Sequence, residues 1–168
     1  MKINHEHHFD ASIDDVVAMF SNEEFAAKRA RATGAEGSDV LVDADEDGAF
    51  TVVIRRIIPA TTIPAEFRAF VGSQIHVRYT EAWDAPDASR EDGGREGTFA
   101  MEIPGTPGHA RGVVVLTPAG TGADFEVSGE VQASVPLVGA MVERAVASAI
   151  GQALPKELAA ADAWLASA

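Results

Sequence analysis

Residues 135–168 carry the clearest periodic pattern of apolar positions in the chain. Apolar side chains recur there at intervals of three and four residues, as on one face of an amphipathic helix. At 1.5 Å per residue, a helix over this range is roughly 40 Å or more long. The predicted inner face consists of Val138, Met141, Val142, Ala145, Val146, Ala149 and Ala153.

Pro155 interrupts this predicted helix. A proline inside a helix clashes with the carbonyl four residues earlier, which here belongs to Gly151. Beyond the proline the apolar positions restart on a different side of the helix, with Leu158, Ala161 and Leu165. Two separate helices are the alternative, but Leu154 is a poor N-cap for a second one. We therefore expect one helix that kinks between residues 151 and 155.

Most of the chain before this helix alternates apolar and polar residues, as strands do. Two short helices, at residues 13–20 and 23–33, follow the first strand, and each starts after a good capping residue, Ser12 or Asn22. Short turns between successive strands predict an antiparallel meander. The predicted strands are residues 2–9, 39–43, 49–58, 74–83, 95–103, 110–117 and 123–134.

The connection at residues 59–72 contains a short amphipathic piece. Its apolar residues are Ile63, Phe67, Phe70 and Val71, at helical spacing. Two interpretations remain open: a lid over a cavity entrance, or a helix that simply caps the core.

Composition narrows the class of protein and of partner. The 168 residues show no break in composition, so we expect one domain over residues 1–168. There are no cysteines and no apolar stretch long enough to span a bilayer, which favours a cytoplasmic protein without stable membrane insertion. With 26 acidic and 13 basic residues the formal net charge is −13, which makes nucleic acid an unfavourable partner. The oligomeric state is not specified by the sequence.

Three stretches resemble those of the START-like helix-grip superfamily, which includes the birch-pollen allergen and the bacterial polyketide cyclases. The third of them resembles one uncharacterised bacterial branch of that superfamily. The stretches are Phe9-Asp10-Ala11-Ser12-x-x-x-Val16-x-x-x-Phe20-Ser21-Asn22-x-Glu24-Phe25, then Tyr79-Thr80-Glu81-x-Trp83, and finally Gly129-x-Val131-x-x-x-Val135-Pro136-Leu137-Val138-Gly139-x-x-x-Glu143.

The resemblance implies an α+β helix-grip fold. In such a fold a seven-stranded curved antiparallel sheet wraps around the long C-terminal helix, and two short helices follow the first strand. Between sheet and helix these domains usually enclose an apolar cavity for lipids, sterols, polyketides or similar molecules. The fold alone does not determine the function.

Arg56 and Glu81 are the most informative charged residues. Each is in phase with apolar neighbours on its strand, so each is expected to point toward the inner face of the sheet. A buried charge is costly unless it is paired. The two can form a salt bridge, orient the head group of a ligand, or, for Glu81, act as a general acid or base. Two interpretations apply to the nearby Tyr79: a structural role in packing, or a catalytic role.

We expect this protein to bind or carry a small hydrophobic molecule between the sheet and the last helix. The alternatives are a polyketide cyclase- or dehydratase-like enzyme that uses Glu81, Tyr79 or a histidine of the first strand, and a structural or interaction domain with a filled core. No catalytic residue is assigned. The predicted cavity-lining residues are Val52, Ile54, Arg56, Phe67, Phe70, Val77, Tyr79, Glu81, Phe99, Met101, Val138, Met141, Val142, Ala145 and Ala149.

A histidine cluster lies on the first predicted strand. His5 and His7 are two residues apart and project to one face, which offers two imidazole ligands to a metal. The sequence names no third ligand, so we expect no metal and no other cofactor.

Overall fold

The computed structural model describes residues 1–59, 61, 65, 68, 73–106 and 108–168. The amphipathic piece around Ile63, Phe67, Phe70 and Val71 falls outside the described residues, so its role stays a prediction. The elements are β1 (Lys2–Phe9), α1 (Ile13–Phe20), α2 (Glu23–Ala32), β2 (Gly37–Ala44), β3 (Phe50–Pro59), β4 (Gln74–Trp83), β5 (Arg95–Glu102), β6 (Gly108–Ala119), β7 (Gly122–Ala133) and α4 (Gly139–Ser167).

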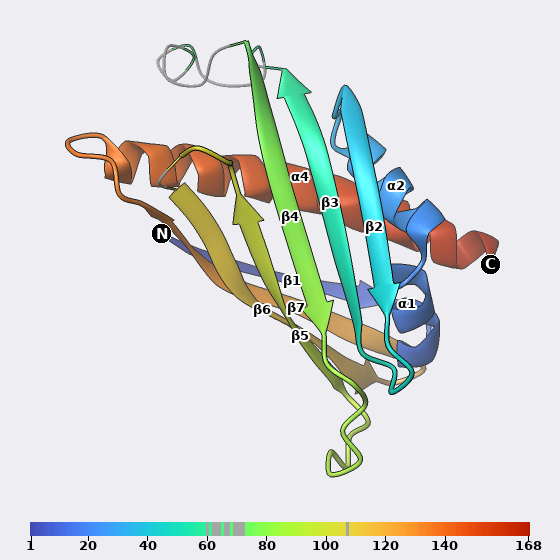
Figure 1. Ribbon diagram of the computed structural model, residues 1–168. Coiled ribbons are helices and arrows are strands. Elements are labelled where there is room, and N and C mark those ends of the chain that lie inside the picture. The colour runs from blue at the N-terminus through green and yellow to red at the C-terminus, as the bar shows by residue number, and fades with distance from the viewer. Residues whose placement is uncertain (60, 62–64, 66–67, 69–72, 107) are drawn as a thin grey trace.

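The seven strands form one antiparallel sheet in the order β1-β7-β6-β5-β4-β3-β2. The sheet is curved, and α4 runs across the strands, with α1 and α2 near its C-terminal end (Figure 1). Residues of α4 pack in the same core as the inward-facing residues of the strands, so the helix lies on the concave side. The predicted α+β helix-grip fold, with a sheet around a long C-terminal helix, is confirmed.

The two short helices begin where their capping residues predict. The Ser12 hydroxyl accepts a hydrogen bond from the Asp15 amide at 3.2 Å. The Asn22 side-chain oxygen accepts from the amides of Glu24 and Phe25, at 2.9 and 3.1 Å. Each cap satisfies backbone donors that a helix leaves free at its first turn. These starts position the buried face of α2 against the core and α4.

Two glycines leave room for an aromatic ring to lie against the sheet. Gly112 of β6 and Gly129 of β7 are direct partners across the strands. A Cβ at either position would lie 2.7 Å from the ring of Phe99, closer than real contacts allow. The absence of a side chain therefore lets Phe99 of β5 lie against the backbone of two neighbouring strands.

The helix α4 is continuous across Pro155, so the expectation of one helix is confirmed, while the predicted kink stays a prediction. It begins at Gly139, later than predicted, because Leu137 adopts a left-handed backbone with φ of 68°. Every fully buried residue of α4 follows the proline: Glu157, Leu158 and Ala161. Among the helices that the structure describes, none is long and apolar enough to cross a bilayer.

The inner face of α4 differs in phase from the predicted one. Met141, with an exposed fraction of 41%, and Ala149 are exposed, so the prediction that they face the sheet is wrong. The residues of α4 that pack against the core instead recur every three or four positions, and one of them is a glutamate. Its members are Val146, Ala147, Ile150, Leu154, Glu157, Leu158, Ala161, Trp164 and Leu165.

Candidate functional site

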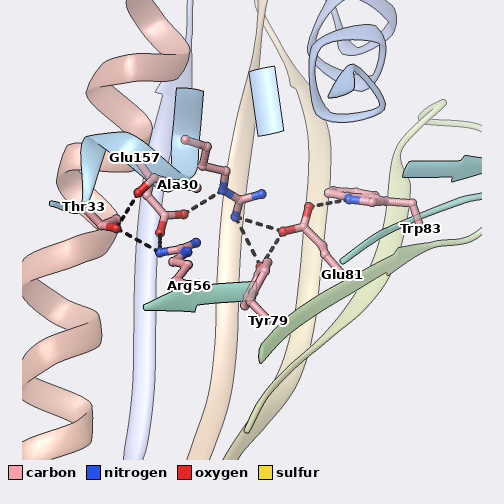
Figure 2. Close-up of polar contacts among 8 residues, drawn as sticks. Ala30, Thr33, Arg56, Tyr79, Glu81, Trp83 and Glu157 are labelled. Carbon is pink, nitrogen blue, oxygen red and sulfur yellow. Dashed lines mark hydrogen bonds and ion pairs between the residues drawn. The ribbon is translucent and has the colours of Figure 1, made fainter. Parts of the chain in front are cut away.

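Four charged side chains meet in the interior, between the concave face of the sheet and the helices. Arg29 comes from α2, Arg56 from β3, Glu81 from β4 and Glu157 from α4, and all four are buried. Glu81 has no exposed surface at all. Figure 2 shows Arg56 bound to Glu157, and Tyr79 bound to Glu81; Arg29 connects the two pairs through its contacts with Glu157 and Glu81. We call Arg29, Arg56, Tyr79, Glu81 and Glu157 the buried polar network.

Glu157 connects both arginines. Its Oε2 atom accepts a hydrogen bond from Arg29 Nε, and its Oε1 atom accepts one from Arg56 Nη1, each at 2.7 Å. Arg56 Nη1 also lies 3.3 Å from the hydroxyl of Thr33, which donates to the Ala30 carbonyl at 2.8 Å. Short bonds between ionised groups are about twice as strong as neutral ones. The carboxylate therefore ties α4 to both α2 and the sheet.

Glu81 occupies the other end of the network. Its Oε1 atom accepts from the indole nitrogen of Trp83 at 2.6 Å. Its Oε2 atom accepts from the Tyr79 hydroxyl and from Arg29 Nη2, the latter at 2.9 Å. Arg29 Nη2 also donates to the Tyr79 oxygen at 3.2 Å. Each oxygen of Glu81 is thus held by donors of the protein.

The surroundings shift the pKa values of Glu157, Arg29 and Tyr79. Burial alone would raise the pKa of Glu157, but the guanidinium groups of Arg29 and Arg56 outweigh it and hold that pKa below its ordinary value. Burial would lower the pKa of Arg29, but Glu81, Tyr79 and Glu157 raise it well above its usual range. Burial, together with the charge of Glu81, raises the pKa of Tyr79 well above 10. Near pH 7 the phenol is therefore neutral, and Glu157 and Arg29 are charged.

The sequence predicted two of these charges and missed the other two. Arg56 and Glu81 point inward as expected, but they do not bond each other; Arg29 and Glu157 lie between them. The signal for Arg29 is its position on the apolar face of α2, four residues after Phe25. Glu157 lies three residues after Leu154 on the packed face of α4. Both positions follow the helical spacing of their apolar neighbours, but spacing does not reveal the distant ion pairs that allow a charge to be buried there.

The other predicted lining residues fall into four groups. Val52, Ile54, Val77 and Phe99 are buried on the concave face. Met101, Tyr79, Val138, Val142 and Ala145 are half-buried, and Met141 and Ala149 are exposed. Phe67 and Phe70 lie outside the described residues. Contact with a ligand remains a prediction for the whole set.

Two hollows on the surface of the described residues are well defined, and neither is the predicted internal cavity. One, of about 410 Å³, lies between α1 and the end of α4 and is lined in part by Met19, Trp164 and Leu165. The other, of about 320 Å³, lies beside the connection between β5 and β6.

Two of the three histidines of β1 contact separate carboxylates. His7 Nε2 lies 2.9 Å from Asp162 of α4, and His8 Nδ1 lies 2.7 Å from Asp124 of β7. The hydrogen bond to Asp124 raises the pKa of His8, with a further contribution from the charge of Asp10. Among the described residues no group of three or more His, Cys, Asp or Glu side chains has the arrangement of a metal site.

The chain shows clear relationships to other proteins in sequence and in fold. The sequence profile described as "Protein of unknown function (DUF2505)" matches residues 4–165. The chain belongs to this DUF2505 family. No curated protein sequence matches the chain.

Solved structures confirm the helix-grip fold of this DUF2505 protein. The protein TTHA0849 of Thermus thermophilus has a TM-score of 0.65 and 14% identity, over 99% of this chain and 98% of that one. The Zhui aromatase/cyclase of Streptomyces sp. R1128 has a TM-score of 0.60 and 10% identity, over 98% of this chain and 93% of that one. A START superfamily protein of Mycobacterium smegmatis has a TM-score of 0.57 and 14% identity, over 99% of this chain and 97% of that one. At these identities the likeness shows the fold, and the resemblance to START-like domains is confirmed at that level.

Proposed function

We propose that this DUF2505 protein binds a small hydrophobic molecule between the concave face of the sheet and the first half of α4. The observation that carries the proposal is the uneven burial of α4. Its fully buried residues all follow Pro155, whereas Val146, Ile150 and Leu154 point toward the core and are only half-buried. Apolar side chains that face a core and keep accessible surface are typical of a binding space.

The sheet opposite contributes the second support. On the concave face Tyr79 of β4 and Met101 of β5 are half-buried, while Trp83 and Leu116, further along the strands, are buried. The concave face is therefore closed where the Trp83 ring stacks on Phe20 of α1, and it is less covered beside Tyr79 and Met101. A methionine suits such a place because its flexible side chain adapts to ligands of different shape.

The resemblance to START-like domains is the third support. Such domains usually enclose an apolar cavity for hydrophobic molecules in this same layer. The saturated hydrogen bonding of Glu81 favours a binding role over general acid–base catalysis, because each of its oxygens is occupied and none of its surface is exposed.

The test is a binding titration with Nile red, a neutral apolar dye, against wild type and two tryptophan variants. Val146→Trp places a large ring in the proposed space, and we expect it to weaken binding at least about tenfold, or about 1.4 kcal/mol. Ser148→Trp adds the same ring on the exposed side of the same helix and should bind like wild type. Native mass spectrometry of the freshly purified protein should also reveal copurified apolar molecules. No dye binding to wild type, or equal binding by both variants, would overturn the proposal.

A further inference from the structure

Among the fully buried side-chain atoms of the buried polar network, one hydrogen-bond donor has no acceptor in the part of the chain that the structure describes. Arg56 Nε is buried and has no hydrogen-bond partner among the described residues, although Nη1 of the same guanidinium binds Glu157 and Thr33. Arg56 as a whole has an exposed fraction of 8%. A buried donor without a partner costs about 1–3 kcal/mol. Such a group in a native protein calls for an explanation.

The carboxylates of the network have no comparable unpaired atom. Both oxygens of Glu157 accept a hydrogen bond from an arginine. Both oxygens of Glu81 accept from Trp83, Tyr79 or Arg29. A group that completes the network must therefore accept a hydrogen bond from Arg56 Nε, since no carboxylate oxygen is left without a donor.

The charge of the network restricts that acceptor further. Two arginines and two glutamates balance, and the pKa of Glu157 lies below its ordinary value, so it stays ionised at neutral pH. A ligand carboxylate would add a buried negative charge with no free cation to neutralise it, which is unfavourable. A neutral oxygen, in a ketone, ester or alcohol, accepts the bond without that charge.

Resting on the proposed function, we propose that the ligand is a neutral hydrophobic molecule with one oxygen acceptor, and that Arg56 Nε donates a hydrogen bond to this oxygen. Arg56 is well placed for this role on β3. Its register partner Val77 and its strand neighbour Ile54 are buried on the same concave face, so apolar surface adjoins the donor. The guanidinium carbon lies 6.0 Å from the centre of the Tyr79 ring, which holds it over the sheet.

The test compares three probes of equal chain length by displacement of Nile red at pH 7.4: decan-2-one, sodium decanoate and decane. We expect the ketone to bind at least about tenfold tighter than decane, because a hydrogen bond from a charged donor contributes free energy of that order. Decanoate should bind more weakly than the ketone. The full chain is used in each measurement.

The matched variants are Arg56→Lys and Arg55→Lys. Lysine at 56 keeps a cation beside Glu157 but removes the Nε–H, so the advantage of the ketone over decane should fall about tenfold, with decane binding nearly unchanged. Arg55 is exposed on the opposite face, where it pairs with Asp39, and its variant should behave like wild type. If Arg56→Lys fails to fold, the relative affinities of the three probes for wild type still test the proposal.

Each outcome has a defined meaning. Equal affinity for ketone and decane would overturn the role of Arg56 and leave the proposed function standing. Tightest binding of decanoate would overturn it too, and would show an acidic ligand. Failure of all three probes, and of Nile red itself, would overturn the proposed function and this inference with it.

Discussion

Arg29 and Glu157 lie 128 positions apart in the chain, and their side chains meet in the interior with Arg29 Nε 2.7 Å from Glu157 Oε2. The contact joins α2 to the C-terminal half of α4. Because Glu157 also binds Arg56 of β3, one carboxylate links both helices to the sheet. The C-terminal half of α4 is thus held in place by ionic contacts as well as by the apolar packing of Leu158 and Ala161.

Replacement of Glu157 by glutamine should destabilise the fold strongly. The amide is close in size but leaves two buried guanidinium groups with one carboxylate, and breaking a buried pair in this way costs about 3–5 kcal/mol. Urea unfolding at pH 7 followed by circular dichroism measures the free energy. The control is Lys156→Gln on the exposed side of the same turn, with an expected change within about 0.5 kcal/mol. A loss below about 1 kcal/mol for Glu157→Gln would contradict the network as described.

The fold could be predicted because its signals are local. Alternation along β4 placed Tyr79 and Glu81 on one face, and the structure puts them there. The caps Ser12 and Asn22 marked the starts of the two short helices. Signals of this kind depend on neighbouring residues and backbone geometry, so they survive without knowledge of the partners.

The inner face of α4 could not be read correctly from periodicity. The helix is rich in alanine, which fits equally well on a packed or an exposed side, so several stripes match the helical period. The decisive residue, Glu157, is charged and was therefore excluded from an apolar stripe. Its burial depends on Arg29 and Arg56, which are far away in the sequence. A local pattern cannot contain that information.

Gly112 and Gly151 should respond in opposite ways to alanine. At Gly112 a Cβ would press against the carbonyl of Ser128 and lie 2.7 Å from the Phe99 ring, so Gly112→Ala should destabilise by about 1–3 kcal/mol. At Gly151, inside α4, a Cβ meets nothing within 4 Å, and Gly151→Ala should stabilise by about 0.5–1 kcal/mol. Thermal and urea unfolding of both variants measure the difference. Stabilisation by Gly112→Ala would contradict the close packing of β5 on β6 and β7.

Arg95 connects the turn between β2 and β3 to the residue that follows β4. Its Nη2 atom donates to the carbonyls of Gly48 and Asp84, at 2.9 and 2.6 Å. Arg95→Met keeps the apolar stem but leaves two carbonyls without their donor, so we expect a loss of about 1–3 kcal/mol in the free energy of unfolding. Arg78→Met, exposed on the convex face of β4, is the control. Equal stability of the two variants would show that the loops do not depend on Arg95.

The lowered pKa of Glu157 predicts how stability depends on pH. Because this pKa is lower in the folded protein than in the unfolded chain, the unfolded chain binds the proton more tightly. The stabilisation is therefore complete above the ordinary pKa of 4.5 and is lost as pH falls through the folded value. Urea unfolding of wild type and Glu157→Gln at pH 7 and at acidic pH should show the gap between the two narrowing in acid. Glu23→Gln, at the start of α2 and exposed, controls for the general effect of removing a carboxylate. A gap that stays constant or widens in acid would mean that Glu157 is not held ionised by the two arginines.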